Sequence, residues 1–107
     1  MVDGEVELNL AGETFILRCT LDAFREVPAR FDGFVGALRR LGVADVDATA
    51  HMIAIGIGKG RNQRERERIA GKLFEAGLDD ALSKLTEWIG LLSAGGKRRE
   101  EAPAEGN

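Results

Sequence analysis

The residues with the strongest chemical character form a basic segment in the middle of the chain. Arg61, Arg64 and Arg68 belong to it, and between positions 59 and 72 six positive charges stand against two negative ones. On a helix, Arg64 and Arg68 lie one turn apart and could contact the phosphates or carboxylates of an anionic partner. However, two glutamates interleave the arginines, and the segment has no aromatic residue to stack on bases. We therefore interpret it as a solvated helix face with internal ion pairs, and nucleic acid is not an expected partner.

A glycine-rich run, Gly56-Ile57-Gly58-Lys59-Gly60, has the composition of a phosphate-binding loop. Its spacing does not fit. A P-loop needs four residues between its glycines and a Ser or Thr after the lysine, and a dinucleotide-binding loop follows a strand. This run follows a predicted helix, so we expect a helix C-terminus and a turn there.

Metal and nucleophile chemistry receive no support from the remaining reactive residues. His51 is the only histidine and has no second ligand one helical turn away. Cys19 is the only cysteine, and we expect it to behave as a small buried hydrophobic residue. No pair of titratable groups has the spacing of a catalytic site. We expect a protein that is not an enzyme and needs no metal, nucleotide or other cofactor.

Length and composition limit the architecture. The chain has 107 residues, 44% of them hydrophobic, and a formal net charge of -3, which indicates one domain without bulk attraction to anionic membranes. A single cysteine excludes an internal disulfide and suits a reducing compartment. The first ten residues lack the pattern of a secretion signal, and no apolar run could span a membrane. The cytoplasm is the expected location.

Two segments near the start alternate apolar and polar residues with the two-residue period of half-buried strands. Gly12 lies between them, so we expect a β-hairpin with Gly12-Glu13 as a type II′ turn. This register puts the apolar residues on one face. The predicted pairs are Leu10 with Phe15, Leu8 with Leu17, Val6 with Cys19, and Glu7 with Arg18.

The chain after the hairpin has the three-to-four-residue apolar period of short amphipathic helices. We expect Pro28 to end the first of them. Residues 4–95 are predicted to form a single α+β domain, an N-terminal β-hairpin followed by a bundle of four to five short helices. Residues 96–107 have no apolar residue larger than alanine, so we expect a disordered charged tail. The expected helix caps are Thr20, Asp32, Asp45 or Asp47, Asn62, and Asp79 or Asp80.

The last predicted helix carries the apolar stripe that we expect to bind a partner. The stripe comprises Leu85, Trp88, Ile89 and Leu92, and Leu82 extends it by one turn. Short helices and one hairpin cannot hide every apolar face, and the excess points to a protein partner or to self-association. An apolar stripe of this spacing is typical of helix-in-groove recognition, and a tryptophan is a common anchor.

The ordered part, from Gly4 to about Leu92, resembles the short proteins of gene transfer agents and related prophages, which are tail tube proteins or tail assembly chaperones. The resemblance lies in the opening Gly4-Glu5-Val6-Glu7-Leu8, the return strand Phe15 to Arg18, and the order of the helical segments that follow. It implies a non-catalytic protein of phage-like tail assembly. Its partner would be the tape-measure protein or another tail protein.

Alternatives to the chaperone role stay open. Within the family, the chain could be a structural component of the tail tube, although tube subunits usually contain a sizeable β-sandwich and this sequence predicts only one hairpin. Outside the family, it could be a small nucleic-acid-binding regulator that uses the segment from Arg61 to Arg68.

Overall fold

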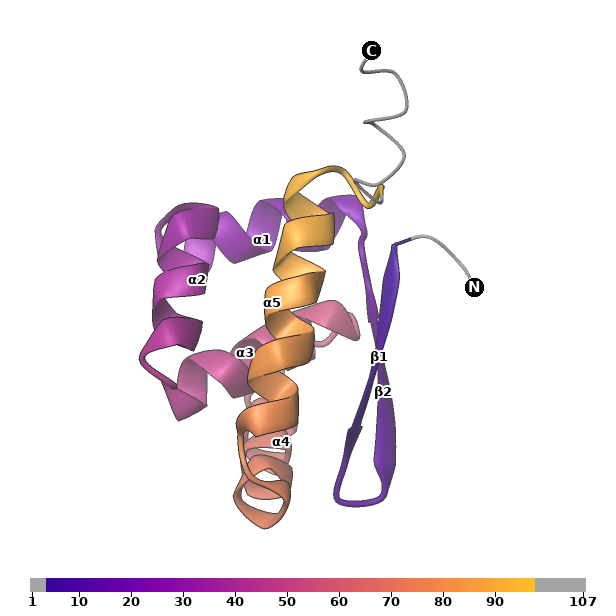
Figure 1. Ribbon diagram of the computed structural model, residues 1–107, viewed down its shortest axis with the longest axis vertical. Helices are drawn as coiled ribbons and strands as arrows, with labels where there is room; N and C mark the ends of the chain where they lie inside the picture. The colour runs from indigo at the N-terminus through magenta and orange to yellow at the C-terminus, as the bar shows by residue number, and fades with distance from the viewer. Residues whose placement is uncertain (1–3, 98–107) are drawn as a thin grey trace.

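The computed structural model of the chain describes residues 4–97 (Figure 1). It confirms the predicted α+β class, with a hairpin followed by helices. The predicted tail, 96–107, lies outside the described residues except for its first two. The elements are β1 (Glu5–Leu10), β2 (Glu13–Arg18), α1 (Leu21–Phe31), α2 (Gly33–Gly42), α3 (Val46–Gly56), α4 (Gln63–Ala76) and α5 (Asp79–Ser93).

The turn of the hairpin differs from the predicted one. Ala11 and Gly12 occupy its two central positions, with φ of 48° and 84°. Two positive φ angles define a type I′ turn, whose twist matches that of the strands. The predicted Gly12-Glu13 turn is wrong, because alanine adopts the left-handed conformation that we assigned to glycine alone.

The strand register is therefore shifted by two residues from the predicted one, with Leu8 opposite Phe15 and Arg18 opposite Glu5. The Nε of Arg18 lies 3.3 Å from the carboxylate of Glu5, so the cross-strand ion pair involves Glu5 rather than Glu7. An even shift keeps every side chain on its face of the sheet. The buried face consists of Val6, Leu8, Leu10, Phe15 and Leu17.

Helices α3, α4 and α5 cover this face of the hairpin. Figure 1 shows α5 running beside the strands, and α3 and α4 also contact them. Helix α3 is central, because eight of its eleven residues are buried. Gly56 at its end lies so close to Leu17 that a Cβ would stand 2.8 Å from a Leu17 methyl group, which indicates that a side chain there would push α3 off β2.

Side-chain caps confirm three of the predicted helix starts. Thr20, Asp45 and Asn62 each accept a hydrogen bond from the backbone N–H three residues on, at 3.0 to 3.1 Å. Asp32 precedes α2 but makes no capping bond. Helix α5 begins after Leu78 without a side-chain cap. Asp79 and Asp80 both lie in its first turn, so the prediction that one of them caps α5 is wrong.

Pro28 does not end the first helix, contrary to the prediction. Helix α1 continues to Phe31, and the chain turns at Asp32, which has a φ of 62°. A proline inside a helix costs a hydrogen bond, and here tertiary packing outweighs that cost. At the corner that follows, Gly36 lets α2 approach the end of α1, since a Cβ at that position would overlap the carbonyl oxygen of Phe31.

The turn geometry gives a test of the register. Asparagine tolerates the left-handed conformation better than alanine, so Ala11→Asn should raise the free energy of unfolding by about 0.5 to 1 kcal/mol. Gly12→Ala should lower it by about 1 kcal/mol. Urea denaturation measures both. A turn at Gly12-Glu13 would instead place residue 11 in a strand, and Ala11→Asn would then destabilise the protein.

Candidate functional site

The stripe predicted to bind a partner is part of the core. Leu85, Trp88, Ile89 and Leu92 are each at most 1% exposed. The Trp88 Nε1–H donates to the carbonyl oxygen of Arg18 at 3.1 Å, which ties α5 to the end of β2. The placement of the binding surface on α5 is therefore wrong. The physical reason is that the two-stranded hairpin needs a large apolar cover, and α5 supplies it.

Arg68 is held in an ion-pair network at the tip of the hairpin. Its guanidinium lies 2.6 Å from the Glu13 carboxylate and 2.9 Å from that of Glu65. Hydrogen bonds from Arg68 lower the pKa of Glu13 and of Glu65, and the same bonds raise the pKa of Arg68. This agrees with the interpretation of the basic segment as a helix face with internal ion pairs.

The other arginines of the segment do not join Arg68 in one site. Arg66 donates to the carbonyl oxygen of Gly60 at 2.7 Å and so braces the start of α4. Within residues 4–97, the side chains of Arg61 and Arg64 make no hydrogen bond or ion pair. Of the three arginines predicted to contact an anionic partner, Arg68 is already paired with carboxylates of the protein. Arg61 and Arg64 could still contact such a partner. The cluster is therefore weaker as a phosphate-binding surface than its composition suggested.

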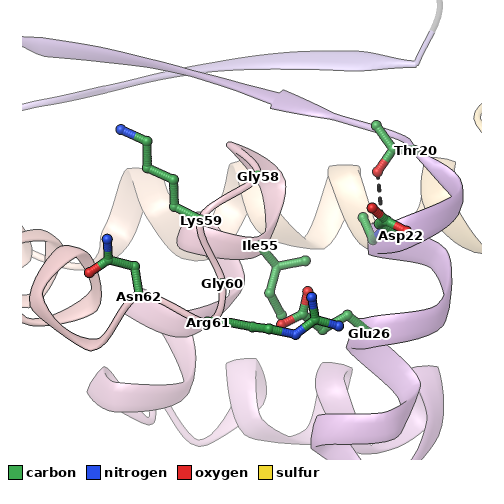
Figure 2. A pocket seen from close by; sticks show the side chains of 10 residues that line it. Thr20, Asp22, Glu26, Ile55, Gly58, Lys59, Gly60, Arg61 and Asn62 are labelled. Carbon is green, nitrogen blue, oxygen red and sulfur yellow. Dashed lines mark hydrogen bonds between the residues drawn. The ribbon is translucent and has the colours of Figure 1, made fainter.

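Arg61 borders an open groove between the start of α1 and the loop that follows α3 (Figure 2). The groove has a volume of about 630 Å³. Asp22 and Glu26 lie on the α1 side, and Lys59 lies on the loop side. One oxygen of Glu26 is buried without a hydrogen-bond partner, and Figure 2 shows Arg61 reaching toward this carboxylate. The groove thus carries charges of both signs, with Asp22 and Glu26 facing Lys59 and Arg61.

The glycine run next to this groove has a structural role. It confirms the predicted helix C-terminus, because α3 ends at Gly56 and Gly58 adopts a φ of 82°. The Lys59 N–H donates to the carbonyl oxygen of Ala54 at 2.7 Å and closes the turn. Gly60 packs against Glu26 and Ile55, where a Cβ would stand 2.6 Å from each side chain.

His51 and Cys19 have surroundings that suit packing. Burial lowers the pKa of His51, and its ring lies edge-on to Phe31 at 5.5 Å. Burial raises the pKa of the Cys19 thiol, which disfavours the thiolate that a nucleophile needs. Within residues 4–97, no group of three His, Cys, Asp or Glu residues is placed to hold a metal ion.

The structure reveals exposed apolar side chains that the sequence analysis did not single out. They form two groups, one on α1 and α2 and one around the C-terminal half of α4. The first comprises Leu21, Phe24, Val35 and Leu38, with exposures of 67%, 40%, 68% and 42%. In the second, Phe74 is 91% exposed.

One sequence signal could have found both groups. The apolar residues of α2 span a wider arc than one buried face, since Val35 and Leu38 lie beside the buried Ala37 and Leu41. Phe74 directly follows the buried Leu73 and so lies about 100° away from it around the helix. An apolar residue outside the buried stripe of its helix was the available clue.

Comparison with known proteins identifies no family for this chain, because no protein-family model, curated protein or solved structure matches it. In the described part of the chain, no helix combines the length and apolarity needed to cross a membrane.

The core position of Trp88 gives a prediction. Trp88→Ala should lower the free energy of unfolding by about 3 to 5 kcal/mol, because it removes a buried indole and leaves the Arg18 carbonyl without its partner. Phe74→Ala is the matched control and should change stability by less than about 0.5 kcal/mol. Chemical denaturation of both variants measures this. Equal effects of the two substitutions would contradict the placement of α5.

The Arg68 network predicts a pH dependence. Because both carboxylates have pKa values below their usual 4.5, their contribution is present near neutral pH and is lost as the pH falls through the folded-state values. Arg68→Gln should therefore reduce stability near neutral pH, by less than about 1 kcal/mol since the pairs are exposed. The difference from wild type should shrink below about pH 4.5. A constant difference across that range would contradict the network.

Proposed function

We propose that this chain is a non-catalytic protein of phage-like tail assembly, a tail assembly chaperone that binds the tape-measure protein through an apolar surface on α1 and α2. The α1–α2 surface consists of Leu21, Phe24, Val35 and Leu38. Its exposure is the observation that carries the proposal. The resemblance to gene transfer agent and prophage proteins supplies the role.

The α1–α2 surface is continuous. Leu21 and Phe24 lie one turn apart on α1, and Val35 and Leu38 lie one turn apart on α2. The rings of Phe24 and Phe34 connect the two helices, with their centroids 5.7 Å apart. Two helices that meet at a corner, are joined by this ring contact and carry exposed apolar side chains suit the apolar face of a partner helix.

A hollow at one end of this surface could receive an anchoring side chain. Leu21 and Phe24 line it together with Cys19 and Leu92, and its volume is about 210 Å³. Leu92 thus contributes to the proposed site as a buried wall rather than as an exposed contact. A mostly apolar lining with few polar groups is typical of pockets that hold an aliphatic or aromatic anchor.

The fold favours the chaperone over the tube subunit. Residues 4–97 contain a single two-stranded sheet, whereas a tube subunit is expected to contribute a sizeable β-sandwich to a ring. A nucleic-acid-binding role receives less support, because Arg66 and Arg68 are engaged within the protein. The proposed setting is the bacterial cytoplasm during particle assembly.

Co-expression with the tape-measure protein tests the proposal. Wild type should keep that protein soluble and copurify with it. Leu21→Glu and Val35→Glu should each weaken the complex about thirtyfold, since loss of an interface anchor costs ~2 kcal/mol. Both side chains are more than two-thirds exposed, so the variants should fold normally.

Phe74→Ser is the matched control, because it removes an exposed apolar residue on a different helix and should leave the complex intact. If wild type leaves the tape-measure protein insoluble and yet occurs in many copies in purified particles, the tube subunit replaces the chaperone as the better account.

A further inference from the structure

His51 is a titratable group at a helix interface that the proposed function does not use. Its Nε2 atom is buried and makes no hydrogen bond. Within residues 4–97, the only other buried side-chain nitrogen or oxygen without a partner is Oε2 of Glu26. Leaving one nitrogen of a neutral imidazole unpaired costs less than leaving a buried imidazolium without an acceptor. The surroundings of His51 therefore favour the neutral ring.

The His51 side chain extends from α3 toward α1 and α4. The Phe31 ring of α1 lies edge-on to it, with the ring centroids 5.5 Å apart. Arg66 and Glu67 of α4 line the same hollow as His51, together with Asp47, one turn earlier on α3. A charge on His51 would therefore arise where three helices meet.

The charged groups around His51 differ in their effect on its protonation. Burial is the largest cause of its lowered pKa, followed by the positive charge of Arg66 and then that of Arg30 on α1. The Glu26 carboxylate and the Gly60 carbonyl favour the protonated ring but do not outweigh these effects. His51 is therefore neutral near pH 7 and gains its proton at a pH below its usual 6.5.

Arg66 connects this histidine to the loop at 57–62, which joins α3 to α4. Its Nη1 donates to the Gly60 carbonyl oxygen at 2.7 Å. Gly60 packs closely against α1, since a Cβ there would stand 2.6 Å from Oε2 of Glu26, and Figure 2 shows the loop facing that helix. An imidazolium beside Arg66 repels the guanidinium and competes with it for the same carbonyl. Protonation of His51 thus opposes the bond that holds the loop in place.

We propose that His51 is an acid-sensitive switch, whose protonation breaks the bond between Arg66 and the Gly60 carbonyl and detaches the loop at 57–62 from α1. The two states are the closed loop with a neutral ring and an open loop with the imidazolium. This inference does not rest on the proposed function, because none of these residues belongs to the α1–α2 surface.

The pH dependence of unfolding measures the switch without interference from other histidines, because the chain has none. The unfolded chain takes up the proton near pH 6.5, and the folded protein takes it up at a lower pH. Stability should therefore be constant above about pH 7 and fall below it, with the unfolding equilibrium constant rising by at most about tenfold per pH unit. His51→Gln should lose this dependence between about pH 7.5 and 5.5, a range above the titration of the carboxylates.

NMR distinguishes a switch from a histidine that titrates without moving the loop. The single His51 ring signal reports its protonation, and the amides of Gly58 and Gly60 report the loop. These amides should exchange faster with solvent in the acidic state, after correction for the pH dependence of intrinsic exchange, and with the same midpoint as the ring. In His51→Gln they should stay equally protected at both pH values. Unchanged protection of the wild-type loop through the His51 titration would overturn the proposal.

Substitutions of the facing charges should move the His51 midpoint in opposite directions. Arg66→Gln removes the largest opposing charge and should raise the midpoint toward 6.5, whereas Glu26→Gln removes a favourable charge and should lower it. Arg68→Gln is the matched control, because it removes an arginine of the same helix that pairs with Glu13 and Glu65 instead. It should leave the midpoint unchanged. A wild-type midpoint at or above 6.5, or one midpoint shared by all four proteins, would refute the switch.

Discussion

The packing of the helices depends on one constraint, which is that the apolar face of the hairpin must be buried. Two strands leave five large hydrophobic or aromatic side chains on one side, and a hairpin of this size is not stable until other elements bury them. Helix α3 approaches closely because Gly56 adds no side chain against Leu17. Helix α5 completes the cover with Trp88, whose indole also satisfies the carbonyl of Arg18, seventy residues away in the sequence.

This use of α5 determines where the protein can present apolar groups to partners. Helices α1 and α2 stand at a corner, and each has apolar residues beyond the face that it buries. Helix α4 buries only a narrow stripe, so Phe74 projects from it. The proposed partner surface on α1 and α2 thus follows from this packing. The ion pairs of Arg68 with Glu13 and Glu65 tie α4 to the tip of the hairpin.

Much of the fold could be predicted because its signals are local. The two-residue period of the strands and the capping side chains of Thr20, Asp45 and Asn62 act within a few residues of the chain. The turn was mispredicted because Ala11 tolerates a left-handed conformation that its residue type disfavours. Pro28 lies inside α1 between the buried Val27 and Phe31, so the burial of this helix outweighs the missing hydrogen bond.

The candidate partner surface could not be predicted from such local signals. Trp88 and Phe74 are both aromatic residues on amphipathic helices, and only tertiary packing decides that one is 0% and the other 91% exposed. Hydrogen exchange by mass spectrometry, with the full chain alone and bound to the tape-measure protein, tests this distinction most directly. We predict that peptides from α5 exchange slowly in both states and that peptides covering 21–38 gain protection on binding. Fast exchange of α5 in the free protein, with protection gained there alone, would contradict the account.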